Sequence, residues 1–86
     1  MSDLREEMAR GENAKRLLED PILREALDKI KANAFEVWKT TPWDAKDARE
    51  ELYRQAVAVE KLENELRKII DGGKKAKSML DKILQR

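Results

Sequence analysis

Apolar residues return at helical spacing along most of this 86-residue chain, and this spacing limits the possible folds more than any other feature. Between residues 21 and 39, and again between 44 and 71, they recur every three or four positions, which places them on one face of a helix. No segment alternates apolar and polar residues as a half-buried strand does. The sequence therefore predicts an all-α fold.

The first long helix is predicted over residues 21–39, with proline near both ends. Asp20 can cap the free backbone N–H groups of a helix, and Pro21 suits the first helical position, where its missing donor costs nothing. Pro42 disfavours helical geometry in the residue before it, so this helix is expected to end near residue 39.

The second long helix is predicted over residues 44–71. Asp44 or Thr41 is expected to cap its start, and the pair Gly72-Gly73 follows the last apolar residue of the pattern, as a helix terminator does. The short connection between the two long helices predicts an antiparallel helical hairpin.

Two shorter helices are expected to flank this hairpin within one domain over residues 1–86. Gly11 separates an N-terminal segment, Ser2 to Arg10, from a short helix over residues 13–19. A basic amphipathic helix is expected over residues 74–86.

The second long helix is apolar on more than one side, which predicts self-association. Tyr53 and Val57 lie about 100–140° around the helix from the line of Leu52, Ala56 and Val59. One partner helix cannot cover both sides, so cover comes either from the terminal helices or from a second chain. We favour an oligomeric helical bundle, with an interface formed by Leu52, Tyr53, Val57, Leu66 and Ile70.

The chain contains neither histidine nor cysteine, although 43% of its residues are charged. Disulfides, thiol nucleophiles, imidazole acid/base catalysis and zinc sites built on these residues are thereby excluded. Carboxylates are the only remaining groups suited to catalysis or metal binding. We expect a protein that is not an enzyme and that holds no metal and no cofactor.

Acidic residues spaced three apart are the best candidates for an alternative, metal-dependent function. Glu25 with Asp28, and Glu60 with Glu63, resemble the magnesium-binding pattern of the all-α nucleotide pyrophosphohydrolases. However, the first pair lies opposite the apolar stripe of its helix and faces solvent. A charged surface joined by i,i+4 pairs is the favoured interpretation, with the pairs Glu63–Arg67, Glu25–Lys29 and Glu50–Arg54.

Glu63 and Gln55 interrupt the apolar stripe of the second long helix. A polar residue at such a position either sets the register of the packing or lies at the edge of the stripe and reaches water. We favour the edge position for both residues.

Positive charge is concentrated at the C-terminal end of the chain. The 19 basic and 18 acidic residues nearly cancel, but residues 72–86 carry five basic residues against one acidic residue. This segment could bind phosphate groups, with aromatic side chains stacking on a base. The candidate ligand-binding residues are Lys74, Lys75, Lys77, Trp43 and Tyr53. The alternative, which we favour, is a solvated lysine face.

All four aromatic residues lie near the turn between the two long helices. Phe35 and Trp38 precede it, Trp43 lies within it and Tyr53 follows it. Phe35 and Trp38 are expected to form a local core that pins the turn. For Trp43, burial over the helix ends and exposure to a partner are equally consistent with the sequence.

Four short motifs carry a resemblance that covers roughly residues 17–80. They are Leu17-Leu18-Glu19-Asp20-Pro21-Ile22-Leu23, Trp38-Lys39-Thr40-Thr41-Pro42, Ala48-Arg49-Glu50-Glu51-Leu52 and Gly73-Lys74-Lys75-Ala76. In these motifs the chain resembles small helical proteins encoded by tailed phages and prophages, which have no assigned catalytic or binding residues. The resemblance implies a viral origin and a role in the host cytoplasm or the virion.

These observations together predict a non-enzymatic phage accessory protein that acts by binding. Its role would be assembly or packaging, or antagonism of host defence, with a phage or host protein as partner. The alternative is an oligomer that binds a nucleotide, a nucleic acid or another phosphate-bearing ligand through the basic C-terminal segment. No apolar stretch is long enough to span a bilayer, so we expect no membrane association.

Overall fold

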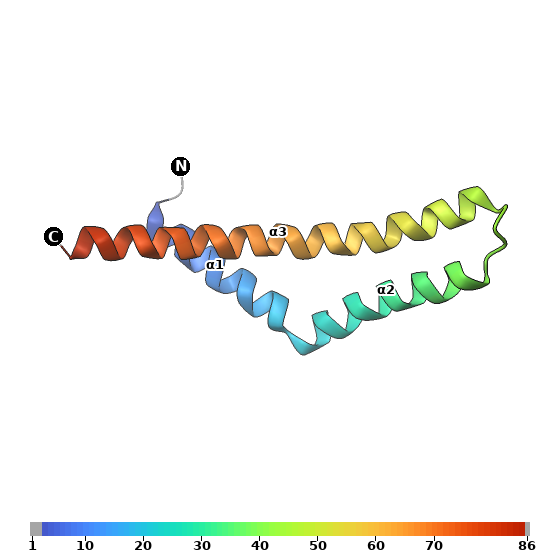
Figure 1. Cartoon of the computed structure of the whole chain (residues 1–86). Coiled ribbons are helices and arrows are strands. Elements are labelled where there is room, and N and C mark those ends of the chain that lie inside the picture. Colours follow the sequence, from blue (N-terminus) through green and yellow to red (C-terminus); the bar gives the residue numbers. More distant parts are fainter. Residues whose placement is uncertain (1–2, 86) are drawn as a thin grey trace.

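The computed structural model of the protein describes residues 3–85, which form three α-helices and no strand (Figure 1). Helix α1 runs over Leu4–Glu19, α2 over Pro21–Thr40 and α3 over Lys46–Leu84. The predicted all-α fold is confirmed. Ser2, where the predicted N-terminal segment begins, and Arg86, where the predicted C-terminal helix ends, lie outside the described residues.

Helix α3 extends along nearly the whole molecule, and the two shorter helices lie along it one after the other (Figure 1). α1 crosses its C-terminal half, and α2 returns beside its N-terminal half. The molecule measures 64 × 24 × 18 Å and has a radius of gyration of 18.4 Å. A compact chain of this length has a radius of about 12 Å, so this shape is strongly elongated.

α1 and α3 touch backbone to backbone at Gly11 and Gly73. A Cβ atom added to Gly73 would lie 2.9 Å from the Cα of Gly11 and 3.1 Å from the carbonyl oxygen of Glu7. Ala14 and Ala76, one turn further along each helix, are 3% and 1% exposed. Small side chains at these four positions allow the two helices to approach closely.

This contact explains why the predicted helix boundaries at glycine are wrong. α3 continues through Gly72 and Gly73 to Leu84, so it does not end near residue 71 and no separate helix begins at residue 74. α1 likewise continues through Gly11, so residues 13–19 belong to α1 and do not form a separate short helix. At Gly11 and Gly73 the missing side chain serves helix packing, which outweighs the low helix propensity of glycine.

The predicted start of α2 is confirmed. One carboxylate oxygen of Asp20 accepts hydrogen bonds from the backbone N–H groups of Ile22 and Leu23, both at 2.9 Å, and Pro21 is the first helical residue. α1 begins in the same way, because Asp3 accepts from the N–H of Glu6 at 2.8 Å.

The start of α3 differs from the prediction, since neither Asp44 nor Thr41 caps it. Ala45 occupies the N-cap position, and no side chain bonds to the first N–H groups. The hydroxyl of Thr41 instead donates to the carbonyl of Val37 at 2.6 Å, at the end of α2. The turn is closed by the N–H of Ala45, which donates to the carbonyl of Pro42 at 3.0 Å.

The apolar core of a single chain is very small. No large side chain among the described residues is fully buried. The buried apolar residues are Ala14, Leu27, Ala34, Val59 and Ala76. Three of these five are alanines, so each chain withdraws little apolar surface from water.

No helix within residues 3–85 combines the length and the apolar character needed to cross a membrane.

Substitution of Gly72 and of Gly73 by alanine should change the free energy of unfolding in opposite directions. A Cβ on Gly72 meets nothing within 4 Å, so Gly72→Ala should stabilise the protein by about 0.5–1 kcal/mol through helix propensity. A Cβ on Gly73 meets the backbone of α1, so Gly73→Ala should lower the free energy of unfolding by about 1–3 kcal/mol. Chemical denaturation of both variants measures this, and an equal response would contradict the close contact.

Candidate functional site

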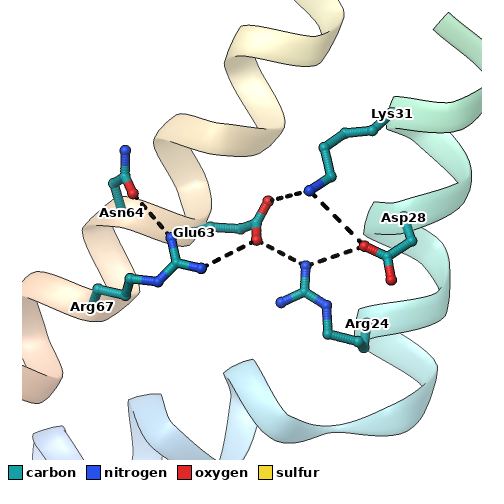
Figure 2. A network of polar contacts seen from close by, with 6 residues as sticks. All are labelled: Arg24, Asp28, Lys31, Glu63, Asn64 and Arg67. Carbon is teal, nitrogen blue, oxygen red and sulfur yellow. Dashed lines mark hydrogen bonds and ion pairs between the residues drawn. The ribbon is translucent and has the colours of Figure 1, made fainter. Parts of the chain in front are cut away.

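A buried carboxylate joins α2 to α3 (Figure 2). Glu63 of α3 is only 4% exposed. The guanidinium of Arg24 donates to its Oε2 at 2.8 Å, and the Nζ of Lys31 lies 3.1 Å from its Oε1. Arg67, one turn along α3, lies 3.6 Å from Oε2. Glu63 therefore sits inside the packing and not at its edge, whereas Gln55 is exposed as expected.

Further charges extend this cluster towards solvent. Asp28 lies 3.4 Å from Arg24 and 3.9 Å from Lys31, and Arg67 donates to the side-chain oxygen of Asn64 at 3.0 Å. The two basic side chains from α2 are about a third exposed, so water reaches their outer faces. The cluster fixes the register of α2 on α3, since displacing either helix would leave a buried charge without its partners.

The surroundings of Glu63 keep its carboxylate ionised. The hydrogen bond from Arg24 lowers the pKa of Glu63, burial opposes this by disfavouring the charged form, and Lys31 lowers the pKa further. The same hydrogen bond raises the pKa of Arg24. A carboxylate held in this way is neither a proton donor nor a free metal ligand near neutral pH.

Several other carboxylates form surface ion pairs within one helix. Within residues 3–85, no three acidic side chains converge in a way that could hold a metal ion. All three predicted i,i+4 pairs are confirmed, at 3.6 Å for Glu63–Arg67, 3.1 Å for Glu25–Lys29 and 2.9 Å for Glu50–Arg54.

At the opposite end from the α1–α3 crossing, aromatic rings and cations lie together near the turn. Phe35 and Trp38 stack with ring centroids 6.2 Å apart and an angle of 15° between planes. The guanidinium of Arg49 lies 4.1 Å from the Trp38 ring centroid, and the Nζ of Lys39 lies 5.4 Å from that of Phe35. Both separations are within the range of cation–π attraction.

Arg49 also secures the end of α2. Its Nη1 donates to the carbonyl oxygens of Trp38 at 3.2 Å and of Thr41 at 2.9 Å. The carbonyl of Trp38 also accepts the N–H of Thr41 at 3.2 Å, and a cation at this end is favoured by the helix dipole. Arg49 is not among the predicted site residues, because its role depends on the fold that brings α3 back beside the end of α2.

The expected aromatic core is wrong. Phe35 is 56% exposed and Trp38 is 38% exposed, so they cover the turn without being buried by it. Trp43 is 82% exposed, so it is not buried over the helix ends. The physical reason is that α1 packs on the other half of α3, so this end of the molecule has only two helices.

A groove opens between α2 and α3 beside these rings. Its volume is about 280 Å³. We call it the aromatic groove, and its walls are formed by Ala34, Phe35, Trp38, Leu52, Tyr53 and Ala56. Lys31 also lines it, but its ammonium group is directed to Glu63, so the one charge at the groove is neutralised.

The residues predicted for an oligomer interface lie in three different surroundings. Leu52 and Tyr53 line the aromatic groove, where Tyr53 is 68% exposed. Val57 and Leu66 are half-buried. Ile70 is half-buried at the other half of α3, where it lines the surface shared with α1. Of the five residues only Leu52 and Tyr53 line the aromatic groove, and an oligomer interface through all five stays a prediction.

The predicted phosphate-binding residues are also separated. Lys74 and Lys77 line a groove of about 70 Å³ between α1 and α3 together with Lys15, which is not among the predicted ligand-binding residues. We call this the basic groove, and Glu12 shares its lining. Lys75 does not line it. The backbone N–H groups here belong to the interior of α3, so no helix N-terminus is available for a phosphate.

The candidate stacking residues lie far from these lysines. Tyr53 precedes Lys74 by about 21 residues on the same helix, which corresponds to roughly 30 Å. Trp43 lies beyond Tyr53, in the turn before α3. A single chain therefore does not combine Trp43 or Tyr53 with the lysines in one site.

Comparison of the chain with protein-family models, with curated proteins and with solved structures found no match.

Removal of the Glu63 charge should destabilise the protein in a pH-dependent way. Because the pKa of Glu63 is lowered on folding, its ionisation stabilises the fold above the ordinary glutamate range, and this contribution is lost as pH falls through the folded pKa. At pH 7, Glu63→Gln should reduce the free energy of unfolding by about 2 kcal/mol, with the difference from the parent narrowing in acid.

Glu60→Gln is the matched control, since Glu60 lies one turn before Glu63 and is exposed. It should change the stability by less than about 0.5 kcal/mol. Urea denaturation between pH 3 and pH 7 (about the range in which glutamate titrates) measures both variants. Equal effects of the two substitutions would show that the buried cluster does not fasten α2 to α3.

Proposed function

We propose that this protein acts by binding, without catalysis, and that its working form is a homo-oligomer. The observation that carries the proposal is its large accessible surface of 6954 Å². A compact folded monomer of 10.0 kDa exposes about 5,200 Å². The excess is well over 1,000 Å², which is more than the roughly 800 Å² that each partner buries in a specific interface of standard size.

The small core supports the same proposal. A chain of this size is only marginally stable even when it is compact, and here the buried apolar residues are chiefly alanines. Large apolar side chains remain exposed on all three helices, including Leu17 on α1, Phe35 on α2 and Tyr53 on α3. Association with further chains supplies the burial that one chain lacks.

The side chains of this chain support a function without catalysis. The chain has no histidine or cysteine, and its most buried carboxylate, Glu63, is held ionised by Arg24 and Lys31. General acid/base catalysis requires a group whose pKa lies near the working pH, whereas this environment shifts the pKa of Glu63 away from neutrality.

The biological role that we propose follows from the sequence resemblance to small phage-encoded helical proteins. We propose an accessory protein that acts in the host cytoplasm or in the virion. Its task would be assembly or packaging, or antagonism of host defence. The partner would be a phage or host protein.

The basic groove favours a second candidate function, which is binding of a phosphate-bearing ligand such as a nucleotide. Lys15, Lys74 and Lys77 come from two helices and line one concave surface, as a polyanion site requires. Glu12 in the same lining opposes this function by offering a negative charge to the ligand.

The oligomer is tested by the mass of the full chain in solution. Sedimentation equilibrium at micromolar concentration should give a mass at least twice the 10.0 kDa of one chain. The midpoint of thermal unfolding should also rise with protein concentration, because mass action favours the associated, folded form. A mass of one chain with a concentration-independent midpoint would overturn the proposal.

The second candidate is tested with ATP and pyrophosphate as probes. Substitution of both Lys74→Gln and Lys77→Gln should weaken binding by about tenfold or more, and the affinity of the parent should fall steeply as salt is raised. Lys75→Gln is the control, because Lys75 lies next in sequence but outside the groove. Calorimetry measures all three proteins; equal loss in the control, or no binding by the parent, would reject this function.

A further inference from the structure

We propose that the aromatic groove is the surface on which a second copy of this chain packs, groove against groove, so that the two α2–α3 ends form one four-helix unit. This inference rests on the homo-oligomer proposed above and adds the location of its interface. The groove lies between two helices of one chain, and two such helix pairs placed face to face bury each other's apolar sides.

The groove has the anatomy of an interface centre. Phe35, Trp38 and Tyr53 are its large side chains, and aromatic residues are enriched at the buried centres of protein interfaces. Phe35 and Tyr53 remain 56% and 68% exposed in the single chain. Each therefore retains most of its apolar surface for burial against a partner.

The charges around the groove permit contact between identical surfaces. The ammonium of Lys31 lies 3.1 Å from Glu63, that of Lys39 lies 3.4 Å from Glu36, and Arg49 donates to backbone carbonyls. Lys31 and Lys39 are therefore paired with carboxylates, and Arg49, which is held by carbonyl oxygens and lies over the Trp38 ring, keeps its charge but does not line the groove. The net charge of each chain is only +1, which adds little long-range repulsion between copies.

The amount of surface also fits a second copy. A standard dimer buries about 800 Å² on each partner. The chain exposes well over 1,000 Å² more than the roughly 5,200 Å² of a compact monomer of its mass, so it can lose that area and still be as well exposed as an ordinary small protein.

A second copy is also the partner that the folding of this end requires. α2 and α3 bury only Leu27, Ala34 and Val59 among their apolar residues outside the α1 crossing. Such a pair needs cover whenever the chain is folded. Identical chains are always available together, and their symmetric pairing is the commonest form of oligomer.

Disruption of the groove by charge is the first test. Tyr53→Glu should weaken self-association of the full chain by about 100-fold, because it buries an unpaired carboxylate at the centre of the interface. Ile83→Glu is the matched control on the same helix, since Ile83 is 54% exposed and lies outside the groove. It should leave the association constant, measured by sedimentation equilibrium, within about threefold of the parent.

The two tryptophans provide a second test, which is carried by Trp43→Phe because this substitution leaves every residue of the groove unchanged. Trp43→Phe leaves Trp38, which lines the groove, as the only indole; Trp38→Phe leaves Trp43, which does not line it. As the protein is concentrated through its association range, Trp38 should become shielded from acrylamide and its emission should shift to shorter wavelength. Trp43 should change less.

The outcomes separate this inference from the proposed function. A parent that stays monomeric overturns both. A parent that associates while Tyr53→Glu associates equally well, or while Trp38 remains as quenchable as in the monomer, overturns the groove as the interface and leaves the homo-oligomer in place. Loss of association in Tyr53→Glu alone, with shielding of Trp38, supports the groove.

Discussion

Contact between the backbones of Gly11 and Gly73 determines where every other surface of the molecule lies. It places α1 on the C-terminal half of α3, and α1 then ends at Glu19. α2 must therefore return along the N-terminal half of α3, without a third helix beside it. The exposure of the aromatic residues near the turn is thus a consequence of helix packing at the other end of the chain.

Polar contacts have an unusually large part in holding α2 to α3. Where apolar cover is sparse, Glu63 binds Arg24 and Lys31 across the two helices, and Arg49 binds the last carbonyls of α2. Desolvation offsets much of the attraction within a buried ion pair, whereas loss of one partner leaves an uncompensated buried charge and is strongly destabilising. The register that they set aligns the two walls of the aromatic groove.

Features that depend on neighbouring residues were predictable from the sequence, and features that depend on distant residues were not. The start of α2 at Asp20 needs only the next three residues, and the i,i+4 ion pairs need only one helical turn. In the sequence Gly73 indicates the end of a helix, because its contact with Gly11 is not visible there. The position of Phe35 and Trp38 near the turn was foreseen, but their exposure depends on where α1 packs. The place of Lys15 in the basic groove was not predictable, because a helix that ends at Gly72-Gly73 does not bring Lys74 and Lys77 beside α1.

The continuity of α3 has a consequence for any ligand that binds more than one chain. Its 39 residues form a helix of about 58 Å, with the aromatic groove near one end and the basic groove towards the other. Because this helix is continuous, it keeps the two regions apart. Under the second proposed function, a small anion would reach the basic groove of one chain only. If two chains pair at their aromatic ends as proposed, simultaneous binding to both would require an extended polyanion long enough to bridge them, so avidity would select ligands by length.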